Sequence, residues 1–236
     1  MENVGHSCPN CGAALDWRLR LTRLVECAQC GAAVALERDG ALRQIGERGD
    51  MADTPALFRV GEVTEALGRP WRALGHVRFS YGPGWWDEFW CVFDGGGARA
   101  DEDALARAET AWFSCDEGDV AMEAALGPDD PAPPAEPGDS SDAMFSWPPQ
   151  SDNLKWPQQT YALTETGEAR CIAFRGELPE AVALGETHRY RLFASQKGGL
   201  MTLETWRDGA GRAQESWSAG RWIDPWEVTA PQSDHP

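Results

Sequence analysis

The chain has 236 residues, 42% of them hydrophobic and 25% charged, and a formal net charge of -17. No run approaches the roughly 18 apolar residues that a membrane-spanning helix needs. The start MENVGHSCPN has neither a basic nor an apolar segment of the secretory type, so we expect a soluble cytoplasmic protein of one large domain, or of a small module and a medium domain.

The acidity is confined to the later part of the chain. Residues 1–50 hold six Arg against seven Asp or Glu, a balance of -1, which leaves -16 for residues 51–236. An acidic surface repels phosphate, so a nucleic-acid partner is not favoured, and only the amino-terminal part offers any place for one.

Two similar motifs, CPNC and CAQC, lie near the start, and a glycine follows each. Together they fit the spacing C-x2-C-x15-C-x2-C, which is typical of structural zinc sites. Two intervening residues let a tight turn present two thiolates, and Gly12 and Gly31 let the backbone turn back. We therefore predict a closed structural Zn²⁺ site. Its ligands are Cys8, Cys11, Cys27 and Cys30.

Three other uses of these cysteines fit less well. A thioredoxin-type redox pair needs a helix start in a βαβ unit, a rubredoxin-like iron site uses a longer separation, and a catalytic zinc keeps one position open. A module of this size cannot bury enough apolar surface to fold alone, so the metal would supply the missing stability. Nearby Arg18, Arg20 and Arg23 would offset the negative charge of the sulfur cluster.

The pattern along the chain is that of strands. Trp17, Leu19 and Leu21 alternate with polar residues, and residues 32–45 predict a hairpin that turns at Asp39 and Gly40. We expect a zinc ribbon over residues 1–46, a linker over 47–56, a β-rich domain over 57–230 and a tail over 231–236.

Within the β-rich domain, residues 71–81 predict a half-buried strand, residues 85–97 a central strand with a glycine-rich end, and residues 101–112 a short helix. One face of the first strand would carry Trp71, Ala73, Val77, Phe79 and Tyr81.

Residues 127–159 hold eight of the sixteen prolines, and we expect an extended acidic excursion without regular elements. Strands resume at 169–174, 187–195, 200–208 and 213–223, with turns at Thr166–Gly167, Lys197–Gly199 and Asp208–Gly209. Strands repeating every ten to twelve residues are typical of a β-sandwich or barrel-like domain. A faint echo between EFWCVFDGGGARA and TLETWRDGAGRAQ hints at two similar halves around the excursion.

Several stretches are similar to the bacterial family called domain of unknown function 4178. They are LFRVGEVTEALGRPWRALGHVRFSYGPGWWDEFWCVFDGG, FRGELPEAVALGETHRYRLFA, LMTLETW and ESWSAGRWI, which together cover roughly residues 57–230. The resemblance implies a β-rich cytoplasmic domain, sometimes preceded by a zinc ribbon, in genes near membrane-stress and polyamine-synthase-like proteins. It implies no catalytic residue.

Twelve tryptophans are many for this length, and large rings serve both as core and as binding platforms. Those beside Gly, Pro and Asp at strand ends are the candidates for an exposed binding surface. They are Trp85, Trp86, Trp222 and Trp226.

Signals of enzymatic activity are few, because no common catalytic motif occurs and the four histidines have no metal-ligand spacing. Five strand carboxylates could converge, although each is more simply a solvated residue. They are Asp87, Glu88, Glu177, Glu204 and Glu215.

The sequence favours a non-enzymatic zinc-ribbon adaptor that binds a protein partner, one encoded in the same operon and linked to membrane stress. The alternative is a binder of a small ligand such as a polyamine, or an enzyme, with its site between two β halves. A convergent set of carboxylates and one histidine in a deep pocket would favour this alternative, a ligand-binding protein or an enzyme.

Overall fold

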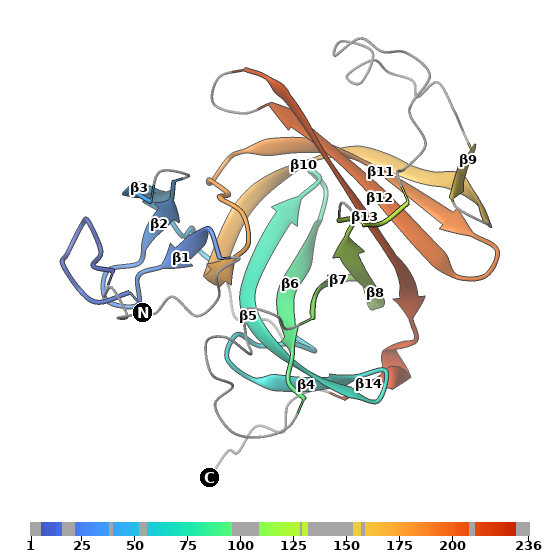
Figure 1. The fold of residues 1–236 in the computed structure, drawn as a ribbon, viewed down its shortest axis with the longest axis horizontal. Coiled ribbons are helices and arrows are strands. Elements are labelled where there is room, and N and C mark those ends of the chain that lie inside the picture. Colours follow the sequence, from blue (N-terminus) through green and yellow to red (C-terminus); the bar gives the residue numbers. More distant parts are fainter. Residues whose placement is uncertain are drawn as a thin grey trace.

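The structure is a computed structural model, and it describes residues 6–15, 22–37, 40–51, 56–95, 109–127, 129–131, 153–156, 159–207 and 211–229. These residues are mostly strand, as the sequence predicts (Figure 1). In this part of the chain, no helix has the length and apolar character needed to cross a membrane.

Fourteen strands make up the described part of the fold, and a one-turn 3₁₀ helix at Pro225–Glu227 precedes the last. The strands are β1 Leu24–Glu26, β2 Ala32–Leu36, β3 Leu42–Glu47, β4 Val63–Ala66, β5 Arg69–Ser80, β6 Trp85–Phe93, β7 Thr110–Asp116, β8 Asp119–Ala125, β9 Asn153–Trp156, β10 Gln159–Leu178, β11 Thr187–Ser195, β12 Gly199–Arg207, β13 Ala213–Ile223 and β14 Val228–Thr229.

Eight of these strands close into an antiparallel ring, which is the barrel-like domain expected from the sequence. One meander runs β5-β6-β7-β8 and a second runs β10-β11-β12-β13. Two junctions join the meanders, β8 with β13 and β5 with β10. The ring therefore consists of two four-stranded halves on either side of the acidic excursion.

The echo seen in the sequence does not relate equivalent strands of these halves. Its first copy begins in β6, the second strand of one meander, whereas its second copy begins in β12, the third strand of the other. Duplication of the halves stays a prediction.

A glycine permits close strand approach at each junction. A Cβ atom on Gly75 of β5 would overlap the carbonyl oxygen of Glu177 on β10, and one on Gly220 of β13 would overlap that of Met122 on β8. Only hydrogen fits at both positions, so these glycines set how tightly the ring closes.

The amino-terminal ribbon is joined to the ring by backbone pairing. Strand β1 pairs with β2 on one side and with the end of β10 on the other, so the sheet continues from the ring into the ribbon (Figure 1). The predicted hairpin is confirmed, because β2 pairs with β3 from Leu36 and Leu42 onward. Trp17, Arg18, Leu19, Arg20 and Leu21 lie outside the described residues.

The two faces of β1 and β2 serve different cores. Leu24, Ala33 and Ala35 pack with apolar residues of the ring, whereas Val25 and Val34 pack with Cys8 and Cys27. The ribbon therefore covers one end of the ring core with its apolar face.

Most strand predictions are confirmed in the second half, where β11 and β13 match the expected bounds 187–195 and 213–223. The turn expected at Thr166–Gly167 is wrong, because β10 runs through it as one strand and bends at a bulge between Leu163 and Glu165. The turn at 208–209 lies outside the described residues.

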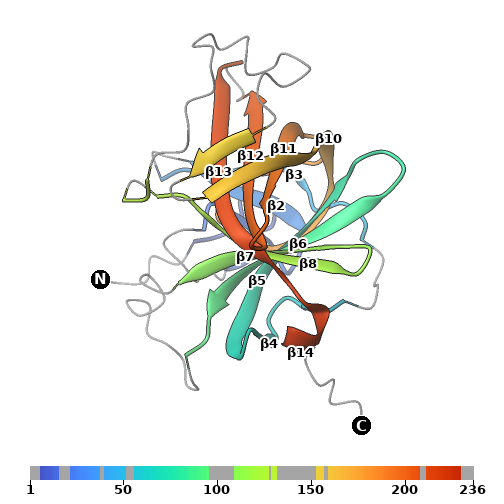
Figure 2. The same cartoon turned by 90° about the vertical axis from the view of Figure 1, so that its right-hand side faces the viewer.

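Two predictions, the helix over 101–112 and the irregular excursion over 127–159, are partly corrected and partly lie outside the described residues. Most of the expected helix 101–112 lies outside the described residues, and its end, Thr110–Trp112, belongs to strand β7. The excursion was expected to lack regular elements, yet its end forms β9, which pairs with the start of β10 (Figure 2). Residues 132–152 lie outside the described part.

The prediction that one face of the strand 71–81 carries all five residues named for it is also wrong. Trp71 and Ala73 pack in an outer cluster with Phe58, whereas Val77 and Phe79 belong to the cluster inside the ring. A β-bulge between Ala73 and Gly75 changes the side to which alternate residues point.

Candidate functional sites: a four-cysteine centre and an acidic lumen

The four predicted metal ligands come together at the tip of the ribbon. All four Sγ atoms lie within 4.8 Å of one another, and Cys8–Cys30 and Cys11–Cys27 are 3.8 Å and 3.7 Å apart. These distances are longer than the S–S bond of a disulfide, which is about 2.05 Å. They match the S···S distance of about 3.8 Å expected when four sulfurs surround one zinc ion tetrahedrally with Zn–S bonds of about 2.3 Å. The sulfur geometry therefore fits a four-coordinate metal ion.

Tight turns present the sulfurs as the spacing predicts. Gly12 and Gly31 have φ values of +76° and +69°, a left-handed conformation that glycine adopts without steric cost. Their amides donate to the carbonyls of Cys8 and Cys27, at 2.8 Å in each case. Two cysteines of the set are buried and two are exposed, so one side of the site is open to solvent.

The interior of the ring, which we call the lumen, contains two adjacent cavities of about 60 Å³ and 110 Å³. Both cavities are lined by Glu88 of β6 and Glu204 of β12, which face each other from the two halves. The smaller cavity also has Glu180 and Glu186, and the larger has Asp116, Asp119, Glu123 and Glu165.

The lumen is thus lined by eight carboxylates, and none of its described lining residues is a lysine or an arginine. Glu88, Glu123 and Glu204 are half-buried, whereas the other five are exposed, so the charge extends from the cavities to the surface. The interior of a small closed ring is usually filled by side chains that pack together, which makes this acidic interior the most unusual feature of the fold.

Aromatic rings form much of the remaining wall. Trp112 and Trp206 line the smaller cavity, and Trp86, Tyr190 and Trp222 line the larger. Trp86 and Tyr190 meet edge to face, with centroids 5.4 Å apart. Such faces attract cations and contact the apolar stem of a ligand.

Neutral donors hold several of the carboxylates in place. The Nε1 of Trp86 donates to Glu88 at 2.7 Å, Thr202 donates to Glu123 at 2.8 Å, and the hydroxyl of Tyr190 donates to Glu165 at 2.6 Å. These bonds fix the carboxylates without neutralising their charge.

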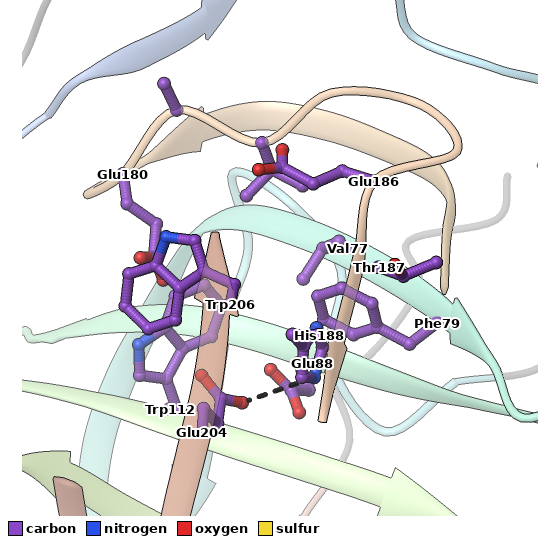
Figure 3. A pocket seen from close by; sticks show the side chains of 12 residues that line it. Val77, Phe79, Glu88, Trp112, Glu180, Glu186, Thr187, His188, Glu204 and Trp206 are labelled. Atoms are coloured by element: carbon purple, nitrogen blue, oxygen red, sulfur yellow. Dashed lines mark ion pairs between the residues drawn. The ribbon is translucent and has the colours of Figure 1, made fainter. Parts of the chain in front are cut away.

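His188 is the one titratable nitrogen among the described residues that line the cavities (Figure 3). Its Nε2 lies 3.6 Å from Oε1 of Glu204, and this buried atom has no hydrogen-bond partner among the described residues. Burial lowers the pKa of His188 to about 4, so the ring is neutral at pH 7 and does not offset the carboxylates.

The carboxyl groups are correspondingly hard to ionise. Burial, together with repulsion from Glu123 and Glu180, raises the pKa of Glu88 to about 7. Burial and repulsion from Glu88 hold the pKa of Glu204 well above its ordinary value, and burial raises that of Glu123. The half-buried acids thus share a site that favours protons or another cation.

The carboxylates named from the sequence separate into different environments. Glu88 and Glu204 converge in the lumen, so the prediction that each is simply a solvated strand residue is wrong for these two. Asp87 points to the other face and binds His76 and Arg78 at 2.8 Å and 2.7 Å. Glu177 is buried beside Thr22, and Glu215 is exposed.

Sequence reasoning missed the contributions of Glu123, Glu180, Asp116, Glu165 and His188. Nothing in their local patterns marks them, because they become neighbours only through the closure of the ring. The alternation of carboxylates with aromatic residues in WWDEFW and LETW is a signal that could have indicated the lumen.

The four tryptophans named as a possible surface also divide. Trp85 and Trp226 are exposed, at 51% and 90%, whereas Trp86 and Trp222 line the larger cavity, with Trp222 still 42% exposed.

The chain belongs to the family described as a domain of unknown function, number 4178, whose sequence profile matches residues 59–225. The match covers the ring and excludes the ribbon. No curated protein and no solved structure matches the chain.

Proposed function

We propose that the protein binds a small organic cation of the polyamine type in the lumen, and that a zinc ion bound by the four cysteines holds the ribbon in its fold. The observation that carries the first part is the set of eight lumen carboxylates with no described lysine or arginine among the lining residues. Like charges gathered in a partly buried space are unfavourable unless a cation joins them.

The arrangement favours an organic cation over a single metal ion. In the described part of the chain, the four cysteines form the one group of three or more candidate ligands close enough to share a metal. The lumen acids are spread over several strands and a loop instead, and aromatic rings line the same cavities. A chain of ammonium groups and methylenes matches both the spread charge and the aromatic wall.

The position of the site supports the same proposal. Glu88 comes from the first meander and Glu204 from the second, so the site lies between the two β halves. A convergent set of carboxylates with one histidine is the feature that distinguishes a ligand-binding protein from a pure adaptor.

A titration with spermidine tests the lumen. Trp86, Trp112, Trp206 and Trp222 line the cavities, so binding should change tryptophan fluorescence. We expect saturable binding that weakens with salt, and a loss of at least about tenfold in affinity for the double variant Glu88→Gln/Glu204→Gln, because charged hydrogen bonds are each worth roughly 1.5–3 kcal/mol.

The matched control is Glu65→Gln/Glu215→Gln, which removes the same charge from exposed strand positions away from the cavities. It should keep the affinity within about twofold, as expected for screened surface charges. No saturable binding, or equal losses in both double variants, would disprove binding in the lumen.

The zinc part is tested by metal analysis of the purified chain. We expect about one zinc per chain, and its loss on replacing Cys8 and Cys27 by Ser, since a four-thiolate site needs all its ligands. Iron in place of zinc, visible by its absorption, would correct the identity of the metal while keeping the site.

Binding of a protein partner is a second candidate, favoured by the exposed rings of Trp85 and Trp226. A protein encoded in the same operon should bind the intact chain and lose affinity for the variant Trp85→Ala/Trp226→Ala. Equal binding to both chains would remove this surface from consideration.

A further inference from the structure

We infer that the metal ion in the ribbon strengthens cation binding in the lumen. It does so by ordering the ribbon, which in turn holds the loop that forms one wall of the smaller cavity. This lumen loop, residues 179–186, joins β10 to β11 and contributes Glu180, Val182 and Glu186 to the cavity. The inference rests on the proposed function for the ligand, and the coupling itself can be measured without one.

The first connection runs from a metal ligand through β1. Cys27 directly follows β1, whose residues Leu24 and Val25 pair with Leu178 and Glu177 at the end of β10. The amide of Arg23 also donates to the carbonyl of Leu178 at 2.8 Å. Leu178 is the last residue before the lumen loop, so β1 fixes the point from which the loop starts.

Side chains strengthen this connection. Glu26, the neighbour of Cys27, accepts a hydrogen bond from the amide of Gly176 at 3.2 Å and forms an ion pair with Arg48. Thr22 donates to Glu177 at 2.9 Å, and both residues are buried. Buried polar pairs of this kind are costly to separate, so β1 and the end of β10 move together.

The second connection leaves the ribbon after β3. The carbonyl of Arg48 accepts from the amide of Phe174 at 2.9 Å, and Arg175 donates to the carbonyl of Gly49 at 3.2 Å. A Cβ atom on Gly49 would lie 2.9 Å from Leu184, within the lumen loop itself. The linker residue Gly49, two positions after β3, therefore lies beside the loop itself.

The position of the ribbon depends on the metal. Its own core consists of Cys8, Cys27, Leu15, Ala32, Val25 and Val34, with Ala13 and Leu42 beside them. So small a cluster cannot hold three short strands without the metal-sulfur bonds. Loss of the metal should therefore release β1 and residues 48–49, and with them the lumen loop.

Linkage makes the effect reciprocal. If metal strengthens cation binding by a given factor, a bound cation strengthens metal binding by the same factor. Spermidine should thus slow the removal of zinc by a chelator.

Hydrogen exchange of the full chain, zinc-loaded and chelator-stripped, tests the coupling. We expect the amides of residues 180–186 to exchange at least about tenfold more slowly in the loaded form, since Pro179 has no amide hydrogen. We expect spermidine to bind the loaded form at least about fivefold more tightly, the lower end of typical coupling. Equal exchange of the loop in both forms of a folded ring overturns the inference.

If the zinc-free protein unfolds, the coupling can still be tested with a variant that keeps all four cysteines. This variant removes the side-chain contacts between β1 and the end of β10. Thr22→Val/Glu26→Gln should still bind Co²⁺ with a thiolate spectrum, yet its loop should exchange rapidly even when loaded with zinc. The matched control Glu47→Gln, exposed on β3, should behave as the wild type. Slow exchange in the double variant contradicts the inference.

The two claims fail in different ways. A loop that responds to zinc in a chain that binds no spermidine supports the coupling and refutes the proposed ligand. Spermidine binding that is equally tight with and without zinc, with a loop that does not respond, supports the ligand and refutes the coupling.

Discussion

Burial and the repulsion of neighbouring acids make Glu88 and Glu204 costly to ionise. Each is half-buried, each faces other acids, and the nearby His188 is neutral at pH 7. A charge held in partly desolvated surroundings without a counter-ion destabilises the fold. Residues that weaken a fold without improving its packing are usually present for binding or chemistry.

Removing these two charges should stabilise the ligand-free protein. Glu88→Gln/Glu204→Gln keeps the shape of the side chains and abolishes their repulsion, so we expect Tm at pH 8 to rise by about 3 °C or more. Differential scanning calorimetry of the wild type and the double variant at pH 8 measures this difference in Tm. A lower Tm in the double variant would mean that the carboxylates serve the fold itself.

The pH dependence of stability follows from the raised pKa of Glu88. The group has a pKa of about 7 in the folded chain against 4.5 ordinarily, so between these values the folded state holds more protons than the unfolded state. Stability should therefore fall as pH rises through this window. Denaturation at pH 5, 6, 7 and 8 should show the decline, and Glu88→Gln should reduce it. An unchanged slope in the variant would contradict the assignment.

At the scale of elements, the two junctions between the meanders decide whether a lumen exists. Gly75 and Gly220 stand at these junctions, each where a Cβ atom would overlap backbone of the neighbouring half. Neither glycine is among the residues with positive φ, so the requirement is one of space and not of backbone conformation.

Adding one methyl group at a junction should be costly. Gly75→Ala or Gly220→Ala forces the strands apart and should lower the free energy of unfolding by at least about 2 kcal/mol. Gly118→Ala is the control, because its φ is +103° but nothing lies within 4 Å of the added atom, and it should cost about 1 kcal/mol. Urea denaturation compares them. Equal costs at all three positions would show that the junctions tolerate expansion.

Local patterns in the sequence predict the strands well and their pairing poorly. The bounds 187–195 and 213–223 are confirmed, because turn signals at Lys197–Gly199 and Asp208–Gly209 delimit these strands. The Cys-x-x-Cys spacing locates all four sulfurs. The bulge between Ala73 and Gly75 and the continuity of β10 through Gly167 depend on neighbouring strands, which alternation alone does not reveal.

The lumen was the hardest feature to anticipate for the same reason. A glutamate on a strand has the same local pattern whether it points to solvent or into a ring. Glu88 and Glu204 are 116 positions apart in the sequence and meet only because two meanders close on each other, with Gly75 and Gly220 at the junctions.

At the scale of the whole molecule, ribbon and ring behave as one unit. Leu24, Ala33 and Ala35 of the ribbon share a core with Leu74 and Phe174 of the ring. The boundaries 1–46 and 57–230 stay predictions about domains, but the shared core implies that the ribbon stabilises the ring.

Loss of the metal should therefore destabilise the ring as well as the ribbon. We expect Cys8→Ser/Cys27→Ser to lower the Tm of the ring, followed by near-ultraviolet circular dichroism, by about 5 °C or more, as several buried apolar side chains lose their cover. A ring that melts at its original temperature would show that the ribbon is an independent appendage.

The most direct test of the acidic lumen counts the protons exchanged when a cation binds. Calorimetric titration of spermidine into the zinc-loaded chain at pH 7, in buffers of different ionisation enthalpy, gives that number. Carboxyl groups with raised pKa values should ionise as the ammonium groups arrive, and we expect a net release of about 0.5–1 proton per spermidine that disappears in Glu88→Gln/Glu204→Gln. Binding without proton release, or no binding at all, would contradict a cation site built from these carboxylates.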